Sequence, residues 1–232
     1  MTPPLALLAG GLATRMRPAT ETIPKSLLEV AGEPFIAHQL RLLLGQGVRR
    51  IVVCAGFLGE QIEDFVGDGA RFGCEVRYSF DGEKLLGTGG ALKRALPLLG
   101  PSFFVMYGDS YLDIDYARVA DDFKASGQSA LMTVFRNEGR WDTSNVEFAE
   151  GRIAKFDKVN RTPAMAFIDY GLGVLKADVI APLPGDTVVD LADIYRDLAA
   201  AGRLAGHEVT TRFYEIGSPA GLAETDAYLR SK

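Results

Sequence analysis

Two glycines, an arginine and a lysine follow the first apolar segment of the chain. Residues 5 to 9 are predicted to form a buried strand, and Gly10 and Gly11 come directly after it. Glycine brings backbone N–H groups close to a ligand, and successive N–H groups in a turn form a concave anion site. Arg15 adds a planar fork for phosphate oxygens, and Lys25 adds a second cation. The sequence therefore predicts a loop that binds a triphosphate.

A carboxylate follows a second strongly apolar segment, residues 102 to 107. Asp109 comes two residues after this predicted central strand. In open α/β sheets the carboxyl ends of the strands face the ligand crevice. Magnesium is commonly held by one or two carboxylates plus phosphate oxygens, so Asp109 is a candidate ligand for Mg²⁺. Asp113 and Asp115 are interpreted instead as turn and helix-capping residues.

The segments that must position these side chains alternate between strand and helix. Apolar runs predict strands at 50–55 and 75–80, and helical spacing predicts helices at 34–46, 59–65 and 116–125. This alternation is typical of a doubly wound α/β sheet. After Gly127 the pattern becomes more extended, with amphipathic spacing at 190–201 and a late helix after Ser218 and Pro219. Strands are predicted there at 129–135, 145–148, 152–156, 168–174 and 211–216.

Length and composition exclude several classes. A chain of 232 residues, 47% of them hydrophobic, can form a single domain with a substantial core. The net charge of −5 argues against nucleic acid as a partner. Cys54 and Cys74 are interpreted as buried thiols, since two cysteines make no disulfide framework. No signal peptide or membrane span is recognised, so we expect a cytoplasmic protein without membrane contact.

The glycine loop resembles a family signature. Residues 8–15 and 24–25 match Leu-Ala-Gly-Gly-x-Gly-Thr-Arg and Pro-Lys of the sugar-1-phosphate nucleotidyltransferases, the nucleotide-sugar pyrophosphorylases, except at Ala13, where the family usually has glycine. Three further motifs follow in the family order, at 87–90, 108–110 and 215–217, so the resemblance covers nearly the whole chain. Neither G-x-G-x-x-G nor G-x-x-x-x-G-K-[ST] occurs.

The resemblance implies a fold and a reaction. The fold would be a Rossmann-like three-layer α/β sandwich with a mixed, mostly parallel sheet, as in GT-A-like nucleotide-diphospho-sugar transferases. We expect one domain over 1–232, with a nucleotide-binding part at about 1–127 and a sugar-binding part at about 128–232. The partners would be a nucleoside triphosphate and a sugar 1-phosphate, and the products a nucleoside-diphosphate sugar and pyrophosphate. A homodimer is left open.

The resemblance also implies roles for single residues. Arg15 and Lys25 would be catalytic, and Asp109 with Glu215 would hold Mg²⁺. The family usually has Asp where this chain has Glu215, which leaves direct and water-mediated coordination open. The expected nucleotide-binding residues are Leu8, Gly10, Gly11, Ala13, Thr14, Gly87, Thr88, Gly89 and Gly90.

Four residues are candidates for the acceptor site. Lys158 resembles a family lysine that contacts phosphate, although an exposed lysine in a charged turn is an equal alternative. Asp169 and Gly171 stand where the family usually has Asn-Ala-Gly, whose polar residue contacts sugar hydroxyls. Trp141 either stacks on a sugar or fills the core.

The base and the acceptor are predicted by a closer analogy. The segment 86–90 is similar to heptose and mannose 1-phosphate guanylyltransferases, which favours GTP with a heptose or hexose 1-phosphate. UTP, dTTP or CTP, and a phosphorylated acceptor other than a sugar, stay open as alternatives. A nucleotide-sensing subunit without turnover is a further alternative, although Arg15, Lys25 and Asp109 are all present.

Overall fold

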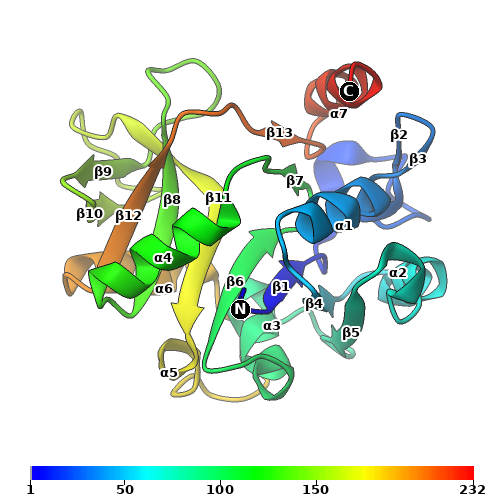
Figure 1. Ribbon diagram of the computed structural model, residues 1–232, viewed down its shortest axis with the longest axis horizontal. Coiled ribbons are helices and arrows are strands. Elements are labelled where there is room, and N and C mark those ends of the chain that lie inside the picture. Colours follow the sequence, from blue (N-terminus) through cyan, green and yellow to red (C-terminus); the bar gives the residue numbers. More distant parts are fainter. Residues whose placement is uncertain (1) are drawn as a thin grey trace.

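The strand that precedes the glycine loop, β1 (Leu5–Leu8), lies inside a nine-stranded sheet (Figure 1). The computed structural model describes residues 2–232. β1 pairs in parallel with β4 (Arg50–Ala55) on one side and β6 (Ser102–Tyr107) on the other. β5 (Glu75–Phe80) is parallel to β4 and forms the edge. The predicted parallel strands are confirmed, and their carboxyl ends share one edge of the sheet.

The other half of the sheet is largely antiparallel. β11 (Phe167–Lys176) is antiparallel both to β6 and to β8 (Ala130–Arg136). β12 (Leu204–Val209) runs parallel to β8, and β10 (Arg152–Phe156) and β9 (Val146–Ala149) complete the order β5-β4-β1-β6-β11-β8-β12-β10-β9. The mixed α/β sheet is confirmed. β12 was not predicted, because its Leu-Ala-Gly-His-Glu-Val segment is short and largely polar in its second half.

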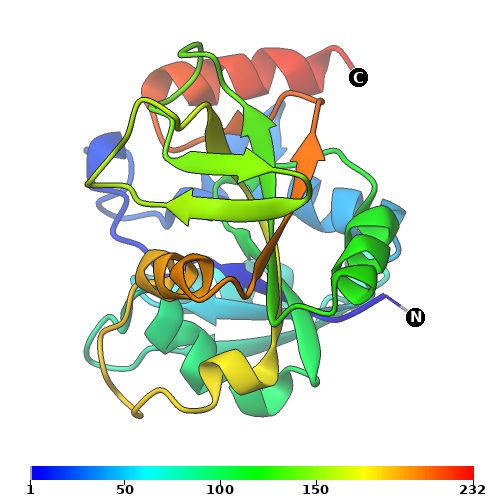
Figure 2. The same cartoon turned by 90° about the vertical axis from the view of Figure 1, so that its left-hand side faces the viewer.

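Helices cover both faces of the sheet, which makes the predicted three layers (Figure 2). Alternate residues of β1 point to opposite faces, as the pleat of a strand requires. The helices are α1 (Phe35–Gly45), α2 (Gly59–Val66), α3 (Gly87–Ala95), α4 (Tyr116–Ser126), α5 (Ala177–Ile180) and α6 (Leu191–Ala200). Leu5 and Leu7 join one buried cluster with α1, α2 and α4, and Ala6 joins a second cluster with α3, α5 and α6.

Two short two-stranded sheets lie beside the last helix. β7 (Ser110–Tyr111) pairs antiparallel with β13 (Tyr214–Glu215), and β2 (Glu29–Val30) pairs with β3 (Glu33–Pro34). The strand predicted at 211–216 is therefore shorter than expected. α7 (Pro219–Arg230) follows, with the predicted cap: the Ser218 hydroxyl accepts a 3.0 Å hydrogen bond from the Gly221 N–H.

Other expectations about single residues also hold. Cys54 and Cys74 are buried, free thiols. The Asp115 carboxylate accepts a 3.0 Å hydrogen bond from the Arg118 N–H and caps α4. Between residues 2 and 232, no helix combines the length and the apolar character needed to cross a bilayer. Short 3₁₀ turns occupy Thr14–Met16, Lys25–Leu27, Ala70–Phe72 and Leu96–Leu98.

Candidate active site

The loops that leave the parallel strands meet at a cavity of about 230 Å³. Their backbones approach so closely that side chains are excluded: a Cβ on Gly10 would lie 3.1 Å from the Gly56 nitrogen, and a Cβ on Gly108 only 2.8 Å from the Leu8 oxygen. Glycine at these strand ends therefore allows the loops to share one hollow. Its lining includes seven residues predicted for the site: Leu8, Gly10, Gly11, Lys25, Gly87, Thr88 and Asp109.

The glycine loop has the tight geometry that anion binding requires. Ala13 adopts φ 48° and ψ 40°, a left-handed conformation that glycine adopts without strain and alanine does not. This conformation gives a physical reason for the glycine that the resembling family has there. The buried Thr20 hydroxyl donates a 2.9 Å hydrogen bond to the Ala13 carbonyl and closes the loop. Thr14 and Arg15 lie on the 3₁₀ turn that follows, with Arg15 exposed.

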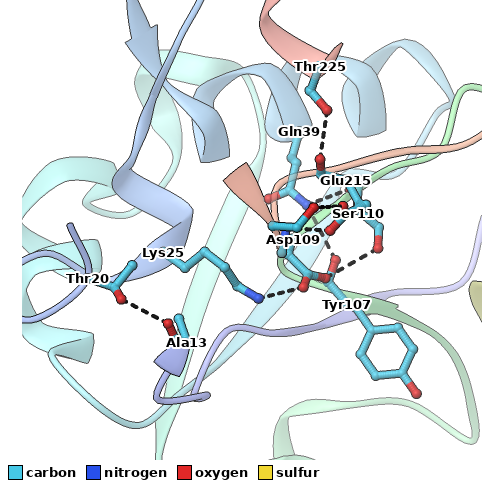
Figure 3. Close-up of polar contacts among 11 residues, drawn as sticks. Ala13, Thr20, Lys25, Gln39, Tyr107, Asp109, Ser110, Glu215 and Thr225 are labelled. Atoms are coloured by element: carbon cyan, nitrogen blue, oxygen red, sulfur yellow. Dashed lines mark hydrogen bonds and ion pairs between the residues drawn. The ribbon is translucent and has the colours of Figure 1, made fainter. Parts of the chain in front are cut away.

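Lys25 and Asp109, separated by 84 residues, form an ion pair (Figure 3). The Lys25 Nζ lies 2.5 Å from the Asp109 Oδ2, and the two side chains are 21% and 23% exposed. A charged pair at this depth is screened less than one at the surface, so the lysine and the carboxylate hold each other at the cavity wall. The structure thus brings together two residues that the sequence predicted separately.

Glu215 reaches the same region through pairing of short strands. Glu215 is the partner of Ser110 between β13 and β7, and the Ile216 N–H donates a 2.9 Å hydrogen bond to the Asp109 carbonyl. The Glu215 carboxylate accepts hydrogen bonds from the Gly217 N–H and, at 2.9 Å, from the Ser218 hydroxyl. Its charge therefore lies at the positive end of α7, where a helix stabilises an anion.

Gly217 lies at the point where the predicted charged residues meet. A methyl group on its Cα would lie 2.5 Å from the Glu215 Oε2, 3.2 Å from the Asp109 Oδ2 and 3.3 Å from the Arg15 Nη2. Two carboxylates beside the glycine loop fit a magnesium ion that keeps several water ligands. Within residues 2–232 no cluster of three or more His, Cys, Asp or Glu side chains could hold a metal alone. The Asp109 and Glu215 carboxylates therefore fit a metal ion that takes its remaining ligands from water and phosphate oxygens.

Three of the acceptor candidates, Lys158, Asp169 and Gly171, lie near one another on the antiparallel side of the sheet, and none of them belongs to the described lining of the cavity. Burial raises the pKa of the Asp169 carboxyl, while the charge of Lys158 acts in the opposite direction, as does a 3.0 Å hydrogen bond from the Gly171 N–H. The Lys158 Nζ lies 5.9 Å from the centre of the Tyr107 ring, which lines the cavity. Gly171 has φ 104°, a conformation that disfavours any other residue.

Trp141 does not fill the core, so that alternative is wrong. Its side chain is 44% exposed, and the Arg212 guanidinium stacks on the indole with its Cζ 3.8 Å from the ring centre. The fully buried Asn137 organises this loop, because its Oδ1 accepts a 3.0 Å hydrogen bond from the Trp141 N–H. The described lining of the cavity does not include Trp141.

Gly89 and Gly90 have packing roles away from the cavity. Their N–H groups donate to the Val189 carbonyl at 2.8 and 3.3 Å, and a Cβ on Gly90 would lie 2.5 Å from the Thr187 oxygen. The Thr88 hydroxyl is also engaged, since it accepts a 2.7 Å hydrogen bond from the Leu191 N–H. Of the glycine motif at 87–90, the residues that line the cavity are Gly87 and Thr88.

The sequence analysis missed several lining residues, and two of them, Ser26 and Asp81, are buried polar side chains. Ser26 is 3% exposed, and its hydroxyl has no hydrogen-bond partner among the residues described. Asp81 is 6% exposed, and its carboxylate accepts a 3.0 Å hydrogen bond from the Leu86 N–H. Burial raises the pKa of this carboxyl above its ordinary value. Asp81 comes directly after a strand, so the strand-end rule that selected Asp109 could also have found it.

Comparisons with known proteins identify the family of this chain. The chain is 31% identical over 224 residues to an N-acetylmuramate alpha-1-phosphate uridylyltransferase of Neisseria meningitidis, covering 95% of this chain and 96% of that one. It is 33% identical over 233 residues to a mannose-1-phosphate guanyltransferase of Hypocrea jecorina, of whose length it spans 64%, and the match covers 97% of this chain. The structure of HddC from Yersinia pseudotuberculosis complexed with GMP-PN superposes with a TM-score of 0.81 at 22% identity, covering 98% and 99% of the chains. A family model described as nucleotidyl transferase matches residues 6–221, so the chain belongs to the nucleotidyl transferase family.

Proposed function

We propose that this enzyme transfers a nucleotidyl group from a nucleoside triphosphate to a sugar 1-phosphate and releases pyrophosphate. The observation that carries the proposal is the Lys25–Asp109 ion pair at a cavity walled by the glycine loop, with Arg15 and Glu215 meeting beside it at Gly217. Cations for phosphate oxygens and carboxylates for a metal are what phosphoryl chemistry requires. The names of the relatives support the same reaction class.

The chemistry needs positioning and charge neutralisation more than acid–base catalysis. An oxygen of the sugar phosphate attacks the α-phosphorus, and the bond from that phosphorus to the bridging oxygen of pyrophosphate breaks in line. A sugar phosphate is largely ionised near neutral pH, so no strong general base is required. Arg15 and Lys25 would stabilise the negative charge that grows on the leaving pyrophosphate. Gly10 and Gly11 would hold its oxygens through backbone N–H groups.

Asp109 and Glu215 are the proposed holders of Mg²⁺, which would neutralise phosphate charge when bound. Asp109 would bind the ion directly. Glu215 would act through water, because both of its oxygens already accept hydrogen bonds from the start of α7. Lys25 would move from Asp109 to the phosphates when the triphosphate enters.

For the substrates we propose GTP and a heptose or hexose 1-phosphate. The relatives include uridylyl- and guanylyltransferases, so the base rests on the similarity of residues 86–90 to guanylyltransferases. Residues 1–127 would bind the nucleotide, and residues 128–232 would supply Lys158, Asp169 and Gly171 to the acceptor. Trp141 would contact the acceptor from its exposed loop.

A pyrophosphate-release screen tests the proposal. GTP, ATP, UTP, CTP and dTTP are each offered with a panel of hexose and heptose 1-phosphates, with and without Mg²⁺. Asp109→Asn is the inactive reference, and Asp121→Asn, which changes an exposed carboxylate on α4, is the matched control. We expect at least one pair to release pyrophosphate with wild type and with Asp121→Asn. If no pair exceeds the rate of Asp109→Asn, the proposal is wrong, and triphosphate binding without turnover would indicate a sensing protein.

A further inference from the structure

Asp81 lies on the side of the cavity opposite to the Lys25–Asp109 pair. The strands run in the order β5, β4, β1, β6, so the strand before Asp81 and the strand before Asp109 are three spacings apart, about 14 Å. The glycine loop leaves β1, between them. A nucleotide whose phosphates reach the glycine loop and Asp109 therefore extends its base toward β5 and Asp81. Both ends line one continuous cavity.

The wall around Asp81 is apolar. Cys54, Leu85 and Ala91 line the cavity with it, as a planar base requires. The charged side chains of the cavity lining are Lys25, Asp109 and Asp81. Lys25 and Asp109 form an ion pair with each other, whereas the Asp81 carboxylate forms no ion pair among the described residues. The nearby Arg94 donates a 2.7 Å hydrogen bond to the backbone carbonyl of Asp81, and its other terminal nitrogen pairs with Asp186.

The Asp81 side chain is therefore largely buried, and its carboxylate keeps acceptor capacity toward the cavity. It accepts one hydrogen bond, from the Leu86 N–H, out of the several that a carboxylate can accept. Removing a carboxylate from water costs free energy, and a ligand with suitable donors recovers part of that cost. The raised pKa of this carboxyl has the same cause, since burial disfavours its charged form.

The common bases differ in what they offer a carboxylate. Guanine presents two adjacent donors, the ring N1–H and the exocyclic N2 amine. Uracil and thymine place their N3–H between two carbonyl oxygens, which a carboxylate repels. Adenine and cytosine present an unprotonated ring nitrogen beside their amine. Two adjacent donors are thus the one pattern that an ionised carboxylate can accept in full.

We propose that Asp81 is the specificity-determining residue of this site and selects guanine by accepting hydrogen bonds from N1–H and N2–H₂. This inference rests on the proposed function only in placing a nucleotide in the cavity. It assigns the choice of base to a side chain that the glycine motif at 87–90 does not contain. Asp81 contacts the base and takes no part in bond making or breaking.

Equilibrium binding of nucleotides to wild type and to Asp81→Asn tests the proposal. Asparagine keeps an oxygen for the Leu86 N–H and turns an amide N–H₂ toward the base. It should repel the guanine amine and donate to the 2-carbonyl oxygen of xanthine. We expect wild type to prefer GTP to XTP, and Asp81→Asn to shift this ratio toward XTP by roughly 5- to 150-fold, the range for one base-edge pair.

Two further measurements make the result decisive. Asp121→Asn removes an equally charged but exposed carboxylate and should leave the ratio of GTP to XTP unchanged. Wild type should also bind ITP, which lacks the N2 amine, several-fold more weakly than GTP. This second comparison needs no variant, so it remains informative if Asp81→Asn fails to fold.

Three results would overturn the inference: a wild-type preference for a pyrimidine triphosphate, equal binding of GTP and ITP, or a folded Asp81→Asn protein with the wild-type ratio of GTP to XTP. None of them touches the reaction class, because pyrophosphate release is measured separately. Conversely, a protein that binds GTP through Asp81 but releases no pyrophosphate would refute the proposed function and leave this inference standing.

Discussion

Replacing Gly217 with alanine should separate the charged residues of the site. The new methyl group would lie 2.5 Å from the Glu215 Oε2, 3.2 Å from the Asp109 Oδ2 and 3.3 Å from the Arg15 Nη2. Gly217 is not among the glycines with positive φ, so the backbone itself accepts alanine and the effect is steric. Each neighbouring atom is the end of a side chain that can rotate away. The protein should therefore fold with its charged groups displaced.

The expected losses follow from these displacements. The Glu215 carboxylate must leave the hydrogen bond that it accepts from the Gly217 N–H, and we expect a loss of about 1–2 kcal/mol in the free energy of unfolding. Misplacing catalytic groups by up to an ångström costs about 100-fold in rate, or about 2.7 kcal/mol of transition-state stabilisation. Urea titration and the kcat/KM for pyrophosphate release measure the two effects separately.

A matched glycine provides the control. Gly45 ends α1, and a Cβ there meets nothing within 4 Å. Gly45→Ala should keep the wild-type kcat/KM and unfold no more easily than wild type, because alanine favours the helix. The reasoning is refuted if Gly217→Ala keeps kcat/KM within about threefold of wild type and is equally stable.

Four more predictions follow from the same geometry. Arg15→Ala should lose about 2–4 kcal/mol of transition-state stabilisation with little change in Tm, because the side chain is exposed; a folded variant with most of its rate would remove Arg15 from the mechanism. Glu215→Gln should need more Mg²⁺ than wild type to reach the same turnover, and equal magnesium titrations would show that Glu215 is outside the metal site. Ala13→Gly should raise the free energy of unfolding by about 1 kcal/mol in urea, since it relieves a left-handed alanine; an unchanged or lower value would contradict this. Burial raises the pKa of Asp169 above its ordinary value of 3.8, so wild type should lose stability as the pH rises from 3.8 through the raised pKa. The amide of Asp169→Asn cannot titrate, so the stability of this variant relative to wild type should grow across that pH range and then level off. A stability difference that does not change with pH would refute the assignment.

The position of the glycine loop and of Asp109, which we propose bind phosphate and metal, was predictable from local sequence. Gly10 and Gly11 follow a short apolar strand, and Asp109 follows another, so their places at the carboxyl edge of the sheet needed only strand periodicity and a general rule for α/β sheets. The cap of α7 was predictable for the same reason, because Ser218 and Pro219 act within one turn of helix.

Contacts between distant segments were decided by the tertiary structure. The Lys25–Asp109 pair joins residues 84 positions apart, and the exposed place of Trp141 depends on Asn137 and Arg212. No local pattern reports the contacts of Lys25 with Asp109 or of Arg212 with Trp141, because they arise only when the fold brings separate segments together.

Asp81 shows most clearly which features the local sequence predicts and which depend on the tertiary structure. Its sequence neighbours mark it as a residue after a strand, and no more. Its burial, its single hydrogen bond to the Leu86 N–H and its place across the cavity from Asp109 depend on the strand order. The sequence by itself determined which residues could bind phosphate and metal, because glycine turns and strand ends are local features. The tertiary structure alone decided which charges share a cavity, because strand order and burial are properties of the assembled sheet.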